Sequence, residues 1–220
     1  MDIQITVADS QHLHHAEGIC DIMEKAAKQR GTGIAKRKPE YIRSKMKEGK
    51  AIVAIDEDNG ELAGFSYIES WQNKQYIANS GLIVHPHYRK LGLGRKIKTR
   101  VFELSREKYP NAKIFGITTS MAVMKINSDL GYKPVTYSEL TTDETFWKGC
   151  QSCPNYDILT DESRKGCLCT GMLYDPKQHN EQSEMTDKRT RWKKFKRFLR
   201  LHQRHIQRKT KKILNNTSLF

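Results

Sequence analysis

The residues with the clearest chemistry in this sequence lie in the stretch LIVHPHYRKLGLGR, residues 82–95. The stretch begins as an apolar strand, stops at Pro86, and enters a helical pattern at Gly92 and Gly94. A strand that feeds a glycine-rich turn and then a helix leaves backbone N–H groups unpaired at the positive end of the helix dipole. Such a turn is an anion site, and a phosphate group is the expected ligand.

The spacing Arg89-x-x-Gly92-x-Gly94 narrows the choice of phosphate ligand. A P-loop needs a Lys followed by Ser or Thr after its second glycine, and a dinucleotide fingerprint needs a third glycine and a downstream acid. Neither pattern is present. With Val84-x-Pro86 before it and a helical pattern after it, the motif resembles that of the GNAT superfamily of acyl-CoA-dependent N-acyltransferases, over roughly residues 1–175.

The resemblance implies a fold and a donor substrate. The expected fold is α/β, with a GNAT-like mixed, mostly antiparallel central sheet, a splayed parallel pair of strands and flanking helices, plus a basic C-terminal helical tail. The expected donor is acetyl-CoA or succinyl-CoA, with the pantetheine arm in the gap between the splayed strands. The residues expected to contact CoA are Leu82, Ile83, Val84, Arg89, Lys90, Leu91, Gly92, Leu93, Gly94, Arg95 and Asn127.

Hydrophobic periodicity predicts an order of elements that agrees with this fold. Helices are expected from Asp9 or Ser10 to near Arg30 and over 39–47, 92–108 and 122–132. Strands are expected over 3–7, 51–55, 62–71, 76–84 and 113–118, and the turn at 58–60 joins the second and third of these.

A general acid is the first catalytic group in question. The resemblance implies a tyrosine four residues before Gly131, where this chain has Asn127. An amide cannot protonate the departing CoA thiolate, although it can hydrogen-bond the sulfur. The thiolate then leaves with hydrogen bonding from Asn127, from a tyrosine such as Tyr137, or from water; the alternative is that Asn127 only caps local backbone.

A base is also needed, because an amine attacks only when it is neutral. The candidates are Glu69, His85 and, third, Glu139. The alternative is that these side chains have no catalytic role, for example that Glu69 faces solvent and His85 only fills the turn before Pro86. Backbone N–H groups near Ile83 or Val84 are expected to hold the oxyanion. These roles describe direct transfer from acyl-CoA to an amine in a ternary complex.

The loop RGTGIAKR, residues 30–37, predicts the kind of acceptor. The cations Arg30, Lys36 and Arg37 favour an anionic small molecule, because guanidinium groups bind carboxylates in a bidentate fork; the alternative is a solvated loop. This loop, NSGLIV, RVFELSREKYPNAKIFG and the four-cysteine end resemble a bacterial subgroup associated with glutamate N-acylation in arginine biosynthesis. Rival interpretations are a protein or aminoglycoside acceptor, or an inactive acyltransferase-like binding protein tethered by its tail.

Four cysteines near the end of the expected domain have plausible zinc spacing. Cys150-x-x-Cys153 and Cys167-x-Cys169 supply four sulfurs, and a C-x-C pair on a strand places both sulfurs on one face. The predicted role is a structural zinc that pins the last hairpin to the sheet. The alternative is that these residues are small buried hydrophobes.

Charge divides the chain into a domain, residues 1–176, and a tail, residues 177–220. The tail holds 14 of the 39 Lys and Arg but only 3 of the 25 Asp and Glu, so most of the net charge of +14 belongs to it. Its helical spacing of apolar residues predicts a basic amphipathic helix that contacts nucleic acid or anionic membrane, or else docks on the domain or stays partly disordered.

The sequence also bears on location and assembly. No apolar run approaches the ~20 residues of a membrane span, and the start lacks the pattern of a signal peptide. A cytoplasmic enzyme with reduced cysteines is expected, and a homodimer is left open.

Overall fold

The computed structural model describes residues 2–30, 36–153, 156, 167–178, 192–193 and 195–200. The chain divides into two compact units, Met1–His179 and Asn180–Phe220. In the second unit the described residues are helical, and the ring of Trp192 stacks on that of Phe195 at 5.4 Å between centroids. The remainder of the predicted tail helix lies outside the described residues, and the functional site belongs to the first unit.

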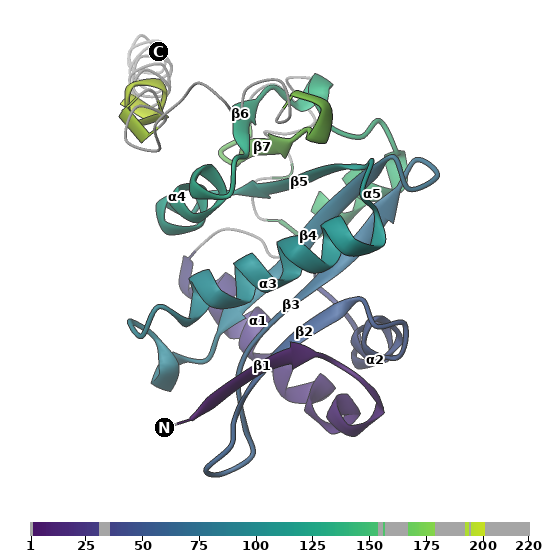
Figure 1. The fold of residues 1–220 in the computed structure, drawn as a ribbon, viewed down its shortest axis with the longest axis vertical. Helices are drawn as coiled ribbons and strands as arrows, with labels where there is room; N and C mark the ends of the chain where they lie inside the picture. Colours follow the sequence, from purple (N-terminus) through teal and green to yellow (C-terminus); the bar gives the residue numbers. More distant parts are fainter. Residues whose placement is uncertain are drawn as a thin grey trace, which may run out of the picture. The chain divides into compact units, whose positions relative to one another are not determined.

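A mixed sheet forms the centre of the first unit (Figure 1). Within the described residues it has seven strands in the order β1-β2-β3-β4-β5-β7-β6. Every neighbouring pair is antiparallel except β4 and β5, which confirms the predicted fold class. The strands are β1 Ile3–Val7, β2 Ala51–Asp56, β3 Glu61–Trp71, β4 Tyr76–Val84, β5 Lys113–Thr118, β6 Lys133–Val135 and β7 Thr170–Tyr174.

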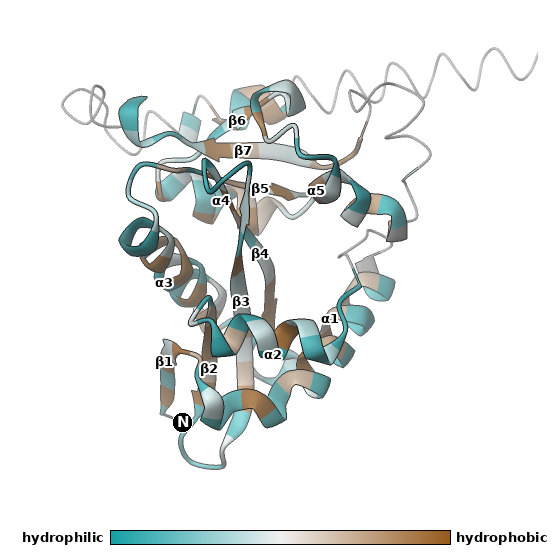
Figure 2. Ribbon diagram, turned by 90° about the vertical axis from the view of Figure 1, so that its right-hand side faces the viewer, coloured by the Kyte–Doolittle hydropathy of each residue, from teal (hydrophilic) through white to brown (hydrophobic). Residues whose placement is uncertain are grey.

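Helices cover both faces of this sheet: α3 lies on one side and α1 on the other (Figure 2). The α-helices are α1 Ala16–Arg30, α2 Pro39–Lys47, α3 Leu93–Lys108, α4 Met121–Asp129 and α5 Glu144–Lys148. Short 3₁₀ helices are η1 Ser10–His15, η2 Pro86–Tyr88, η3 Tyr137–Glu139 and η4 Gly149–Ser152. No helix in the described part of the chain is long and apolar enough to cross a membrane.

The first predicted helix differs in one respect from the structure. Its opening turns are the 3₁₀ helix η1, and the α-helix begins only at Ala16. The cause is local, because the Asp9 side chain accepts from Gln11 N at 2.9 Å while His12 Nδ1 accepts from Asp9 N at 3.2 Å. This reciprocal capping box holds a tight first turn.

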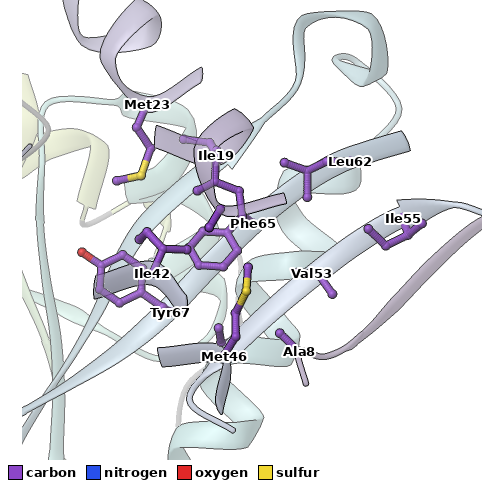
Figure 3. Packing of buried hydrophobic residues seen from close by; sticks show 13 residues of the cluster. Ala8, Ile19, Met23, Ile42, Met46, Val53, Ile55, Leu62, Phe65 and Tyr67 are labelled. Carbon is purple, nitrogen blue, oxygen red and sulfur yellow. The ribbon is translucent and has the colours of Figure 1, made fainter. Parts of the chain in front are cut away.

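The α1 and α2 side of the sheet is held by a continuous apolar core (Figure 3). Every third or fourth residue of each helix points to the same face, so the apolar positions of the two helices meet those of β2 and β3. The central side chains of this core are fully or almost fully buried: Ile19, Met23, Ile42, Met46, Val53, Phe65 and Tyr67.

The feature that positions the site is the parting of β4 from β5. The two strands pair only over Tyr76–Ala78 and Lys113–Phe115, although both continue beyond this point. A bulge follows in β4, where Gly81 and Leu82 lie opposite the single residue Ser66 of β3. Gly81 has φ +64°, and a Cβ there would lie 2.4 Å from the Tyr67 ring, so only glycine fits.

Two glycine substitutions test this packing. In Gly64→Ala the new Cβ would lie 2.4 Å from Ile97 Cδ1 and 2.9 Å from the backbone oxygen of Ile83, so we expect a loss of about 1–3 kcal/mol in unfolding free energy. In Gly18→Ala, on α1, the Cβ meets nothing within 4 Å, and we expect a gain of about 0.5–1 kcal/mol. Urea unfolding measures both, and equal effects would contradict the packing of α3 against β3.

Candidate functional site

A cavity of about 200 Å³ opens where β4 and β5 part. One wall is the backbone of β4 from Ala78 to Leu82, and another is β5 and the turn after it, from Phe115 to Thr119. Polar side chains from other elements also line it: Arg37, Glu69, Lys98 and Asn127. The structure therefore gathers into one cavity residues that lie far apart in the sequence, from Arg37 to Cys169.

Glu69 of β3 is the most heavily bonded carboxylate in the cavity wall. Its side chain is buried, and the residue is 4% exposed. Arg37 Nη2 and Tyr41 OH donate to Oε1 at 3.0 Å and 2.5 Å, and Ser80 Oγ donates to Oε2 at 2.6 Å. The guanidinium and the two hydroxyls together compensate the buried negative charge.

The groups around Glu69 have fixed protonation states. Burial raises the pKa of Tyr41, and the charge of Glu69 raises it further. Burial also raises the pKa of Tyr67. For Arg37, burial alone would lower the pKa, but Tyr67 and Glu69 outweigh it and the pKa is raised. Both phenols are therefore neutral, with Tyr41 donating to Glu69 and Tyr67 accepting from Arg37, and Arg37 remains a cation.

The predicted acceptor-binding cations are only partly brought to the cavity. Arg37 lines it, but its Nε donates to Tyr67 OH at 2.9 Å and its Nη2 to Glu69, so most of its fork is used within the protein. Lys36 is exposed and pairs with Glu24 at 3.4 Å. The Arg30 side chain and residues 31–35 lie outside the described part of the chain.

The glycine turn has the geometry of an accessible helix N-terminus. Gly92 adopts the left-handed conformation, φ 75°, as the N-cap of α3, and no side chain caps that end. Lys90 also has positive φ, at 69°. Residues 89–92 are exposed, so the first turn of α3 and its dipole are open to an anion.

The end of β4 leads from this turn to the cavity. His85 N donates to Ala63 O of β3 at 2.9 Å, so the alternation of a strand directs the amide of Val84 away from β3. On that side the Val84 carbonyl accepts from Arg89 Nε at 3.3 Å. Between Val84 and the cavity lies the bulge at Gly81 and Leu82, whose backbone forms part of the cavity wall.

Asn127, at the position where the resemblance implies a tyrosine, lies in α4 and lines the cavity. It is 1% exposed. Its Nδ2 contacts Met172 Sδ at 3.6 Å, while its Oδ1 has no hydrogen-bond partner among the residues that the structure describes. A buried acceptor without a partner indicates that a bound molecule supplies the missing donor. An amide N–H or a thiol of a pantetheine arm fits this role.

Of the three predicted bases, the structure brings Glu69 alone to the cavity. His85 ends β4 outside the cavity lining, its ring lies 5.9 Å from that of Tyr88, and its Nδ1 is buried without a partner. Glu139 is exposed and closes a capping box, accepting from Thr136 N at 3.0 Å.

Lys98 is a site residue that sequence reasoning missed. It lies in α3 between apolar neighbours, is 2% exposed, and lines the cavity. Its Nζ donates to Asn79 Oδ1 at 3.1 Å and lies 5.2 Å from the Tyr132 ring centroid. Burial lowers its pKa to about 7. No local sequence pattern marks it, because its partner Asn79 lies on another element, β4, and bonds Ser105 of α3 as well.

The four C-terminal cysteines line the same cavity. A hydrogen bond from Cys169 lowers the pKa of the Cys167 thiol. The Tyr137 hydroxyl donates to the carbonyl of Cys169 at 2.7 Å, which ties β7 to η3. Among the described residues, no group of three or more His, Cys, Asp or Glu side chains could hold a metal ion. The predicted zinc is therefore without support in this geometry.

Comparison with known proteins assigns a family to this domain. Residues 19–123 match the model of the family described as Acetyltransferase (GNAT) family. This part of the chain is therefore similar to GNAT acetyltransferases. A curated relative, the L-methionine sulfoximine/L-methionine sulfone acetyltransferase of Salmonella typhimurium, is 26% identical over 84 residues. The match spans 36% of this chain and 49% of that relative, so it covers about half of its length.

Solved structures with the same fold agree with this assignment. N-acetylglutamate synthase from Neisseria gonorrhoeae, complexed with coenzyme A and N-acetyl-glutamate, aligns with a TM-score of 0.55 at 14% identity, over 80% of this chain and 35% of that chain. Rv2747 from Mycobacterium tuberculosis, in complex with CoA and NLQ, aligns with a TM-score of 0.56 at 15% identity, over 78% and 98% of the two chains. At these identities the likeness shows the fold.

The burial of the Lys98 amine predicts how the stability of the folded chain depends on pH. The pKa of Lys98 is about 7 in the folded chain and 10.5 ordinarily, so between these values the unfolded chain holds a proton that the folded chain has lost. Raising the pH therefore favours folding. Relative to Lys98→Met, the native chain should gain up to ~1.4 kcal/mol in unfolding free energy per pH unit from pH 7 to 10. Urea unfolding at pH 7, 8 and 9 measures this, and a difference that stays constant would contradict it.

The charge pair of Glu69 and Arg37 makes a second prediction. Glu69→Gln keeps the shape of the side chain but leaves the Arg37 guanidinium without its anion, and we expect a loss of about 3 kcal/mol. The double variant Arg37→Gln, Glu69→Gln removes both charges and should lose less than Glu69→Gln alone. Urea unfolding of both variants measures the coupling, and strictly additive losses would show that the two charges do not interact.

Proposed function

We propose that this chain is an acyl-CoA-dependent N-acyltransferase that moves an acetyl or succinyl group to the amine of a small acceptor by direct transfer in a ternary complex. The observation that carries the proposal is the single cavity shared by the parted strands and the buried Glu69. On one side of the cavity, the backbone edge of β4 leads to the exposed N-terminus of α3. On the other side of the opening lies the carboxylate of Glu69. Donor and acceptor therefore meet without a covalent enzyme intermediate.

The donor is held mainly by backbone. The exposed amides at the start of α3 receive the diphosphate of CoA, because the N-terminus of a helix without a side-chain cap binds anions. The pantetheine arm follows the open edge of β4, where the outward amide of Val84 and the free oxygen of Asn127 complete its hydrogen bonds. The backbone at the end of β4 holds the oxyanion that forms upon attack.

The acceptor amine enters from the side of Glu69. Three donors already bond this carboxylate, and its remaining lone pairs accept a hydrogen bond from the incoming ammonium group. The ammonium gives its proton to solvent water, and the neutral amine then attacks the thioester carbonyl. Asn127 hydrogen-bonds the departing sulfur, and the thiolate leaves because a thiol pKa is only ~8.5.

A small amino acid, with glutamate as the first choice, is the proposed acceptor. The names of two similar proteins support this class: one is an acetyltransferase of methionine sulfoximine, and the other is an N-acetylglutamate synthase. The basic loop that favoured glutamate lies mostly outside the described residues, and Arg37 is engaged by Glu69. A place in arginine biosynthesis, a cytoplasmic location and a homodimer stay predictions.

Thiol release tests the proposal. The purified chain is incubated with acetyl-CoA or succinyl-CoA and, in turn, glutamate, ornithine, methionine sulfoximine and a peptide amine. We expect glutamate to raise thiol release at least ~10-fold above the rate without acceptor, consistent with positioned bimolecular reactants. A flat panel would contradict the amino-acid acceptor, and faster release with the peptide amine would favour the rival protein acceptor.

A matched pair of variants at Gly94 controls this test. A Cβ added at Gly94 would lie 3.5 Å from Val84 Cγ2, which is ordinary van der Waals contact, so Gly94→Asp and Gly94→Asn both fit sterically. The Asp carboxylate favours the helix N-terminus but repels a diphosphate, and we expect it to weaken CoA binding more than ~10-fold compared with Asn. Calorimetry with CoA measures both affinities. Equal affinities would contradict diphosphate binding at this turn, and an inactive binding protein would retain CoA binding without thiol release.

A further inference from the structure

Lys98 is a cation that the proposed chemistry leaves without a role. Its neighbours in the sequence on the buried side of α3 are the apolar residues Leu93, Ile97, Val101 and Leu104. A leucine or methionine at this position would extend that face at no electrostatic cost. An amine, in contrast, must give up most of its hydration when it is buried.

The hydrogen bonds around Lys98 leave part of the amine unused. Asn79 Oδ1 is its only hydrogen-bond acceptor among the described residues, and no described carboxylate lies within ion-pair distance of it. The same Asn79 oxygen also accepts from Tyr132 OH at 2.9 Å, and Asn79 Nδ2 donates to Ser105 Oγ at 2.7 Å. Both lone pairs of the Asn79 oxygen are therefore in use, and an ammonium with three N–H groups has two that face no acceptor among the described residues.

The cavity is where those N–H groups can find a partner, because Lys98 is part of its lining. Asn79 pairs with Ile68 across the ladder, whereas Ser80 pairs with Tyr67. Successive residues of a strand point to opposite faces. Asn79 and Lys98 are thus on the α3 side of the sheet, and Ser80 and Glu69 are on the α1 side.

This division separates the two substrates. The proposed acceptor enters beside Glu69, and a longer acyl group of the donor can extend into the part of the cavity on the α3 side, whose lining includes the amine of Lys98. An acetyl methyl group would leave the amine facing an apolar atom. A carboxylate at the far end of a longer acyl group would instead accept two charge-assisted hydrogen bonds.

We propose that Lys98 binds the terminal carboxylate of the acyl group, so that the donor is the CoA thioester of a short dicarboxylic acid such as succinate. This inference rests on the proposed function. It chooses succinyl-CoA over acetyl-CoA, the two donors that the proposed function leaves open. Tyr132 packs against the Lys98 amine, and burial raises the pKa of that phenol well above 10. The other titratable residues of the cavity lining are Arg37, Tyr67, Glu69, Tyr137, Tyr156 and the four cysteines. Arg37 is the second cation among them, and its guanidinium is already bonded to Tyr67 and Glu69 on the α1 side.

Calorimetry with non-hydrolysable donor analogues tests the inference without turnover. The ligands are CoA and the succinyl-CoA and butyryl-CoA analogues in which a methylene group replaces the thioester sulfur. We expect the native chain to bind the succinyl analogue at least ~10-fold more tightly than the butyryl analogue, as a charge-assisted hydrogen bond allows. Lys98→Met should reverse this preference while keeping its affinity for CoA. Lys108→Met, an exposed lysine at the end of the same helix, should behave as the native chain does.

Proton uptake gives a second, independent measurement. At pH 8 the amine is mostly neutral, since its pKa is about 7, and a bound carboxylate draws it back to the charged form. Titrations in buffers of different ionisation enthalpy should show that the protein takes up close to one proton when the succinyl analogue binds. It should take up none when the butyryl analogue binds. This measurement needs only the native chain, so it decides the inference even where Lys98→Met fails to fold.

The outcomes are distinguishable from failure of the proposed function. If the native chain binds CoA but shows no preference for the succinyl analogue and no proton uptake, the donor inference is wrong and the acyltransferase proposal stands. If CoA and both analogues fail to bind, the proposed function itself is wrong.

Discussion

The parting of two parallel strands is the constraint on which the rest of this structure depends. β4 and β5 share hydrogen bonds over three residue pairs and then diverge, although each continues as a strand on its other side. The backbone groups of the inner edges would be costly to bury without partners. Such an opening is stable only if a bound molecule or water supplies hydrogen bonds, and this makes it the natural place for an extended, amide-rich arm such as pantetheine.

One feature on each side of the opening keeps β4 and β5 apart. On the β4 side, the bulge at Gly81 and Leu82 changes the register with β3, and the left-handed Gly81 leaves room for the Tyr67 ring. On the β5 side, β7 pairs with every residue from Ile114 to Thr118 and draws that strand into a separate hairpin-like layer with β6. The sheet thus consists of two halves joined at one short contact, and the cavity lies at that junction.

The polar groups in the cavity show two different solutions to burying charge. The Glu69 carboxylate accepts hydrogen bonds from Arg37, Tyr41 and Ser80. Lys98 has only the neutral Asn79 and the face of Tyr132, so its charge is not compensated and its pKa falls to about 7. The difference follows from partners, since both side chains are almost completely buried. An uncompensated group next to a cavity is poised to respond to a ligand.

The sequence by itself determined the fold class and the glycine turn at the start of α3. Periodicity of two and of three to four places the strands and helices, and Gly92 and Gly94 after Val84-x-Pro86 define an open helix N-terminus, because these signals depend only on residues near one another in the chain. Only the tertiary structure decided which charged groups share the cavity. It placed Glu69 in it and His85 and Glu139 outside it, engaged Arg37 within the protein, and brought in Lys98, which no local pattern had marked. Burial and pairing are set by strand register and helix packing, and these join residues that the sequence keeps far apart.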